Sequence, residues 1–147
     1  GGIADTWYRA DVYNYVDYGS NYNSMWGITP NSEAYIAPFG GKGIYYVSAS
    51  FSASVAFPTP PTFELIYRLA MDINGTTEYS SPMYVSAYVS LIPFPLSIST
   101  IFRINDSDDG DPNDPLKSPQ FYLEMNNFTS TKEINTSHLC LNVIRLY

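Results

Sequence analysis

The stretch from Ile36 to Val55, IAPFGGKGIYYVSASFSASV, decides how this chain folds. After Pro38 and a cluster of glycines, the side chains sort with a period of two. Apolar residues take one set of positions: Tyr45, Val47, Ala49, Phe51, Ala53 and Val55. Tyr46 and four serines take the other: Ser48, Ser50, Ser52 and Ser54. Only an extended strand sorts residues in this way, because successive side chains point to opposite faces. We therefore expect a strand from Gly43 to about Phe57 whose apolar face needs a second sheet to cover it.

The rest of the chain has the spacing of turn residues that is typical of an all-β protein. Its 11 prolines and 9 glycines separate short alternating runs, and no helical periodicity is present. The expected further strands are Thr6–Tyr18, Met25–Ile28, Ala34–Ala37, Phe63–Asp72, Met83–Leu91, Leu96–Ile104, Phe121–Met125 and His138–Tyr147. Asn74-Gly75 indicates a tight turn after Asp72. The pattern predicts an antiparallel sandwich or barrel of about eight to ten strands, in which a jelly roll, an immunoglobulin-like sandwich and an up-and-down barrel remain open. The immunoglobulin-like form is disfavoured because the paired cysteines around a tryptophan are absent.

Composition limits what the chain can do. Its 147 residues suit a single domain over 1–147, with 1–5 expected to be a linker remnant. The net charge of −7 and the scattered basic residues disfavour nucleic-acid binding. No apolar run is long enough for a spanning helix, so we expect no membrane insertion. Cys140 is the only cysteine, which excludes an internal disulfide. The 14 tyrosines and low charge indicate surface that is made for contact with other molecules.

The order of these features resembles the trimeric jelly-roll heads of the complement-q and tumour-necrosis-factor superfamily, most of all those at the tips of viral and phage fibres. The segment Tyr35-Ile36-Ala37-Pro38 is followed by Gly43-Ile44-Tyr45 and the long strand of small and apolar residues. The strand that ends in Asn74-Gly75 and the closing segment Leu141–Leu146 also fit the family pattern. Two features depart from it. The Gly-Asp pair is displaced to Gly110-Asp111, and no collagen-like repeat precedes the domain.

The resemblance implies a bell-shaped subunit that packs as a homotrimer, with flat aromatic and aliphatic faces on the threefold axis. The expected interface residues are Tyr45, Tyr84, Tyr88, Leu146 and Tyr147. The doubly apolar last strand, His138–Tyr147, agrees with this expectation, since such a strand is either central in its sheet or covered by a neighbouring subunit.

An acidic loop follows Ile104 and contains Asp106, Asp108, Asp109 and Asp111. Oxygen ligands at this spacing could hold calcium, although position twelve of a calcium-binding loop would be Leu116 and not glutamate. A solvated loop without a cation is the alternative. No other cofactor is expected. Four sequons are candidate glycosylation sites, at Asn74, Asn105, Asn127 and Asn135.

A sugar-binding platform is a second candidate site. Trp7 and Trp26, with Tyr18 and Tyr22, could stack on the apolar face of a pyranoside while neighbouring Asn and Asp residues meet its hydroxyls. The alternative is that these aromatic side chains pack in the core or against the next subunit. We find no paired carboxylates, phosphate loop, zinc spacing or catalytic triad, so we expect no enzyme.

The sequence thus favours a non-enzymatic virion structural or attachment protein, the trimeric head of a fibre, spike or capsid decoration at the virion surface or in the extracellular space. Its expected partners are copies of itself, other virion proteins and a host surface glycan or protein receptor. A secreted receptor-binding ligand domain of the same superfamily and a carbohydrate-binding module of a larger enzyme are the alternatives.

Overall fold

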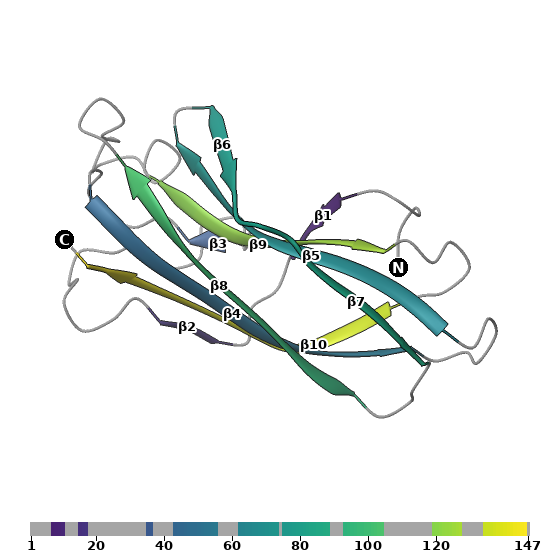
Figure 1. The fold of residues 1–147 in the computed structure, drawn as a ribbon. Helices are drawn as coiled ribbons and strands as arrows, with labels where there is room; N and C mark the ends of the chain where they lie inside the picture. Colours follow the sequence, from purple (N-terminus) through teal and green to yellow (C-terminus); the bar gives the residue numbers. More distant parts are fainter. Residues whose placement is uncertain are drawn as a thin grey trace.

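The chain folds as a sandwich of two β-sheets (Figure 1). The computed structural model describes residues 7–10, 15–17, 35–36, 43–55, 62–73, 75–88, 93–104, 119–127 and 134–146. These residues form ten strands in chain order: β1 (Trp7–Arg9), β2 (Tyr15–Asp17), β3 (Tyr35–Ile36), β4 (Gly43–Val55), β5 (Thr62–Ile73), β6 (Thr76–Tyr79), β7 (Met83–Tyr88), β8 (Phe94–Ile104), β9 (Gln120–Asn127) and β10 (Ile134–Arg145). The all-β prediction is confirmed. The described residues include no helix that could cross a membrane.

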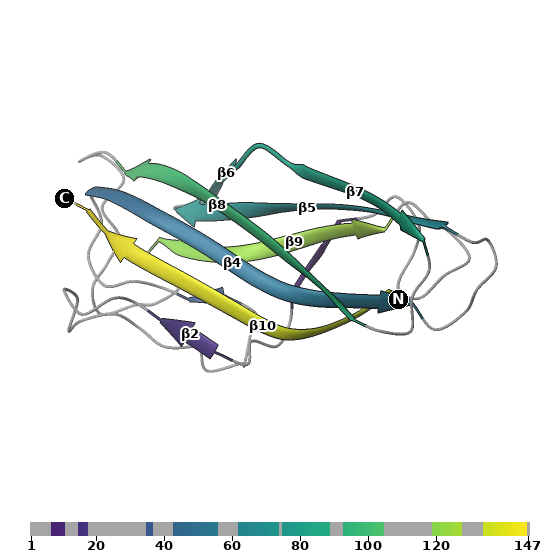
Figure 2. The same ribbon diagram turned by 60° about the horizontal axis from the view of Figure 1, so that its bottom comes forward.

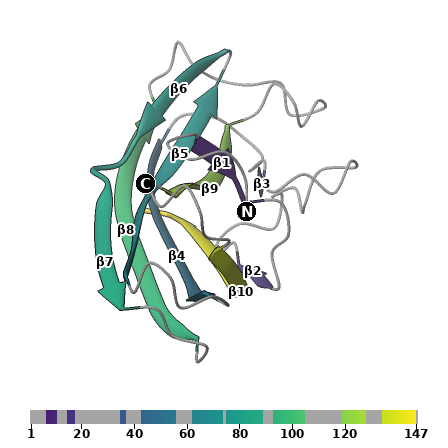
Figure 3. The ribbon, with the colours of Figure 1, turned by 90° about the vertical axis from the view of Figure 1, so that its right-hand side faces the viewer.

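The first sheet, here called the β4 sheet, has the strand order β2-β10-β4-β8. The second, the β5 sheet, has the order β1-β9-β5-β6, with β3 also on β9 and β7 also on β5. Figure 2 shows the long strands of the β4 sheet side by side in front of β5 and β9. Among the described strands, every pair is antiparallel except β2 with β10, which is parallel. Seen end-on in Figure 3, the edge strands β7 and β8 lie on the same side of the sandwich.

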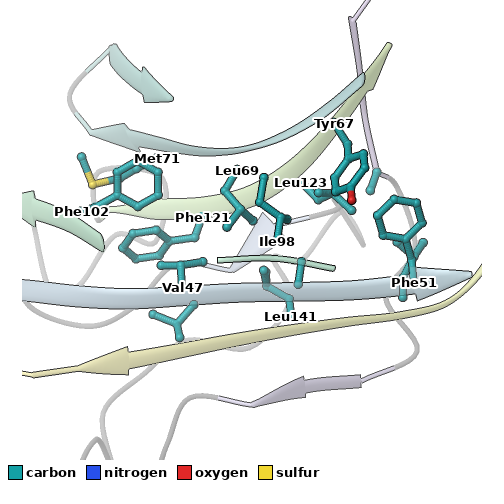
Figure 4. Packing of buried hydrophobic residues seen from close by; sticks show 14 of the residues in the cluster. Val47, Phe51, Tyr67, Leu69, Met71, Ile98, Phe102, Phe121, Leu123 and Leu141 are labelled. Carbon is teal, nitrogen blue, oxygen red and sulfur yellow. The ribbon is translucent and has the colours of Figure 1, made fainter. Parts of the chain in front are cut away.

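The predicted alternation on β4 is confirmed from Tyr45 to Ser54. Tyr45, Val47 and Ala53 are buried in the interior, while Tyr46 and Ser50 are exposed on the other side. The interior is filled by aliphatic side chains and aromatic rings from both sheets (Figure 4). Phe51 of β4 meets Tyr67 of β5 edge to face, with ring centroids 5.1 Å apart. Such ring pairs add to the free energy of burial and fix how the two layers stack.

The β5–β6 hairpin forms where Asn74-Gly75 predicts a turn. Ile73 pairs with Thr76, so two residues connect the strands, and Gly75 has a φ of 80° that favours glycine. The sequence gives no sign of β6 itself. Its residues are mostly exposed and lack apolar alternation, so the strand depends on the turn that precedes it.

The predicted single strand over Thr6–Tyr18 is wrong. Its ends form two short strands in different sheets: β1 pairs with β9 in the β5 sheet, and β2 pairs with β10 in the β4 sheet. The apolar residues of this segment do not keep one continuous alternation, which is why two separate pairings share it. The expected strand at Met25–Ile28 lies outside the described residues.

Strand β10 contains a bulge that keeps its apolar residues on the core. Between Ser137 and Cys140 two residues face one position of β4, and His138 takes a positive φ of 54°. The extra residue puts His138 in solvent and turns Leu139 inward, so that Leu139, Leu141 and Val143 all join the core.

The central position of Leu69 in this core gives a first prediction. Leu69→Ala should lower the free energy of unfolding by about 2–5 kcal/mol, since it removes a fully buried side chain and leaves a cavity. The exposed control Glu78→Ala should change it by less than about 0.5 kcal/mol. Urea denaturation measures both, and equal effects of the two substitutions would contradict this core.

Candidate functional site

Most residues of the two sequence-predicted sites lie outside the described part of the chain. This holds for Tyr18, Tyr22 and Trp26 of the sugar platform, and for the acidic loop residues Asp106, Asp108, Asp109 and Asp111. Among the sequons, Asn74 and Asn105 also lie outside it. Asn127 is the last residue of β9, and Asn135 is the second residue of β10. Trp7 is the one platform residue whose side chain is described.

The outward face of the β4 sheet carries an apolar cluster. Ile144 of β10, Tyr46 of β4 and Ile101 of β8 are direct cross-strand partners, so their side chains lie in one row across three strands. All three are exposed, Ile101 most of all at 59%, and Leu146 follows on the same face of β10 at 48%. We call these four residues the aliphatic cluster.

Beyond the aliphatic cluster the same face becomes hydroxyl-rich. Ser48 lies between Ser99 and Asn142, and Ser50 lies between Ser97 and Cys140. All of these residues except Cys140 border an open hollow of about 590 Å³, which Ser81 and Met83 close at the β7 end. Its lining contains no charged residue. The face is therefore apolar at one end, where the exposed Arg103 of β8 also lies, and neutral and polar along the hollow.

The outward face of the β5 sheet has different chemistry, centred on Arg68. The guanidinium of Arg68 is inserted between two rings, 3.8 Å from the centroid of Trp7 and 3.6 Å from that of Tyr79. It also forms an ion pair with Glu124, with 2.8 Å between Nη2 and Oε2. Cation–π contact and ion pairing together hold β1, β9, β5 and β6 across this face. The Trp7 ring thus packs on its own chain.

A second arginine extends this network. Arg9 lies over the ring of Tyr122, 3.7 Å from its centroid, and its guanidinium is 3.4 Å from the carboxylate of Asp72. Asp72 in turn accepts hydrogen bonds from Tyr122 and Thr77. Burial raises the pKa of Tyr122 far above its ordinary value, so this hydroxyl stays protonated and remains a donor at physiological pH.

Tyr84 occupies the β7 side of the same face. Its side chain is 55% exposed, and its hydroxyl donates a hydrogen bond to the carboxylate of Glu64. That hydrogen bond and the Glu64 charge raise the pKa of Tyr84. Tyr84 is a direct partner of Ile66 on β5, and Ile66 is in register with Asn126 and Trp7, so one row of side chains runs from β7 to β1.

The residues expected at the trimer interface do not lie on one common surface. Tyr45 points inward and has no exposed area, so it belongs to the core of its own chain, because odd positions of β4 face the β5 sheet. Tyr84 lies on the outward face of the β5 sheet, and Leu146 lies in the aliphatic cluster. The side chains of Tyr88 and Tyr147 lie outside the described residues.

Within the described strands, no group of three or more His, Cys, Asp or Glu side chains could hold a metal ion. His138 and Cys140 border a smaller hollow on the outward face of β10, beside Ser50 and Ser97. Sequence reasoning missed the Arg68 and Arg9 networks. The alternation of Ile66, Arg68, Ala70 and Asp72 marks an outward face, but the sequence does not say which aromatic rings reach these charges.

Comparison with models of known protein families gives no match, and comparison with curated proteins finds no similar sequence.

Arg68 provides a test of the network on the β5 sheet. Arg68→Ala should lower the free energy of unfolding by about 1–3 kcal/mol, since it leaves the largely buried carboxylate of Glu124 without its ion-pair partner. Arg68→Lys should recover less than half of this loss, because an ammonium group cannot fill the planar slot between two rings. Chemical denaturation measures both variants. Full recovery with lysine would contradict the stacking role.

Proposed function

We propose that this chain is a non-enzymatic attachment head that works as a homotrimer at the surface of a virion, where it binds a host glycan or protein. Two lines of argument support the proposal. The sequence resembles trimeric fibre heads over most of its length, and the sandwich carries one outward face suited to contact with copies of itself. Avidity from three linked sites would strengthen weak single contacts.

The strand pairing supports a jelly roll. β5 pairs with β7, β4 with β8, β3 with β9 and β2 with β10. In the sequence these pairs are nested, with β5 and β7 as the innermost pair and β2 and β10 as the outermost. A long two-stranded ribbon folded over itself gives this nesting. The parallel direction of β2 departs from that scheme, and it concerns only the outermost pair.

The aliphatic cluster is the main observation in favour of a homotrimer. Ile101, Tyr46 and Ile144 expose apolar surface in one row, continued by Leu146. A contiguous patch of this kind on a small domain marks a contact surface, and aliphatic side chains suit a protein partner that can exclude water from them. Packing of three copies around an axis would cover the cluster in every subunit and leave the β5 sheet facing outward.

The mass of the protein in solution tests the trimer. Multi-angle light scattering should give three times the chain mass of 16.5 kDa. The double substitution Ile101→Asp/Ile144→Asp should reduce this to the mass of one chain, because charges would be buried without partners. Thr76→Asp, an exposed control on β6, should leave the trimer intact. A wild-type protein that is monomeric at micromolar concentration would overturn the proposal.

A further inference from the structure

We propose that the outward face of the β5 sheet, around Tyr79, Tyr84 and Arg68, binds a neutral oligosaccharide. This inference rests on the proposed function, since it names the ligand class of the attachment head and the surface that takes it. Its starting point is the difference in chemistry between the two outward faces of the sandwich.

The exposed apolar surface of the two faces is of different kinds. On the β4 sheet, three of the four residues in the aliphatic cluster are Ile or Leu. On the β5 sheet, the large exposed apolar side chains of the described outward face are tyrosines: Tyr79 at 48% and Tyr84 at 55%. A tyrosine ring offers a flat apolar surface with a polar tip, which fits the apolar face and hydroxyl rim of a sugar ring better than it fits an aliphatic protein core.

Both rings are held in place before any ligand arrives. Tyr79 stacks on the Arg68 guanidinium at 3.6 Å, and Tyr84 is fixed through its hydrogen bond to Glu64. A side chain that is already ordered loses little conformational entropy on binding. The ring surfaces turned away from these contacts remain open, as the exposures of about one half indicate. Preformed rings are what a weakly binding ligand such as a glycan requires.

Polar groups suited to sugar hydroxyls surround the rings. Glu64 and Ser86 lie beside Tyr84, and Asp72, Thr77 and Arg9 lie beyond Tyr79. Carboxylates accept hydrogen bonds from hydroxyl groups, and guanidinium groups donate them. The row from Tyr84 to Trp7 crosses β7, β5, β9 and β1, a width of about 14 Å at the usual strand spacing. This width suits a short oligosaccharide and exceeds a single sugar ring.

Charge indicates that the ligand is neutral. The chain carries a net charge of −7. The two guanidinium groups described on this face are both engaged, Arg68 with Glu124 and Arg9 with Asp72. An acidic glycan would have to displace one of these carboxylates and approach an anionic protein. A neutral glycan would need neither step.

The test is an array of neutral and sialylated oligosaccharides probed with the assembled wild-type protein, followed by calorimetry with the best neutral ligand. We expect binding to neutral oligosaccharides only. Tyr84→Ala and Tyr79→Ala should each weaken the affinity about tenfold, as expected for the loss of a stacked ring. Tyr84→Phe keeps the ring and loses only the hydrogen bond to Glu64, so it should weaken the affinity by no more than about threefold.

Tyr8→Ala is the matched control. Tyr8 is a tyrosine of similar exposure at 39%, but it pairs with Met125 and points to the opposite side of the β5 sheet. It should leave the affinity unchanged. Circular dichroism and thermal unfolding establish that each variant is folded.

The outcomes separate this inference from the trimer. A blank array with an intact trimer would overturn the glycan site and leave the trimeric head standing. Exclusive binding of sialylated glycans, or neutral binding that Tyr79→Ala and Tyr84→Ala leave unchanged, would also overturn it. A monomer that binds neutral glycans through Tyr84 would sustain the site and overturn the trimer.

Discussion

The strict alternation of apolar and polar side chains along β4 determines how the two sheets of this molecule pack. Its inward side chains, including Val47 and Phe51, must be covered, and the β5 sheet covers them with Phe121 and Tyr67. Because β4 lies between β10 and β8 in one sheet, its register also sets which side chains of those two strands face inward. A slip of one residue would exchange the two faces of the strand and put serines into the core.

The same alternation creates the outward surfaces. Once Val143 and Phe102 face the core, their neighbours Ile144 and Ile101 are left outside with Tyr46, in one row across three strands. On the β5 sheet the outward positions hold arginines, carboxylates and aromatic rings that satisfy one another. A sandwich has two outward faces, and in this chain they differ in kind: one carries an exposed row of apolar side chains, and the other carries aromatic rings and charged groups in contact with one another.

Sequence patterns predicted the parts of the fold that follow from alternation. The long strands β4, β5 and β8 and the turn at Asn74-Gly75 lie where the residues indicate them, and β10 begins at Ile134, before the predicted start at His138. The patterns failed where pairing, and not local preference, decides the structure. The segment around Trp7 divides between two sheets, and β6 exists because a hairpin returns it to β5.

The surfaces were less predictable than the fold for a related reason. A cation–π contact such as that of Arg68 with Trp7 joins residues from distant parts of the chain, and no local pattern marks it. Trp7 is a candidate platform residue in the sequence, yet its contact with Arg68 depends on the register of β1 on β9. The inward position of Tyr45, by contrast, follows from the same alternation that identified β4.

Hydroxyl-radical footprinting with mass spectrometry tests most directly whether the two faces have these different roles. In one chain Tyr46, Tyr79 and Tyr84 are all substantially exposed. If copies of the chain cover the β4 sheet, Tyr46 in the assembled protein should be oxidised several-fold more slowly than Tyr79 and Tyr84. Oxidation of Tyr46 at the same rate as Tyr79 and Tyr84 would contradict the account, because it would leave the aliphatic cluster open to water.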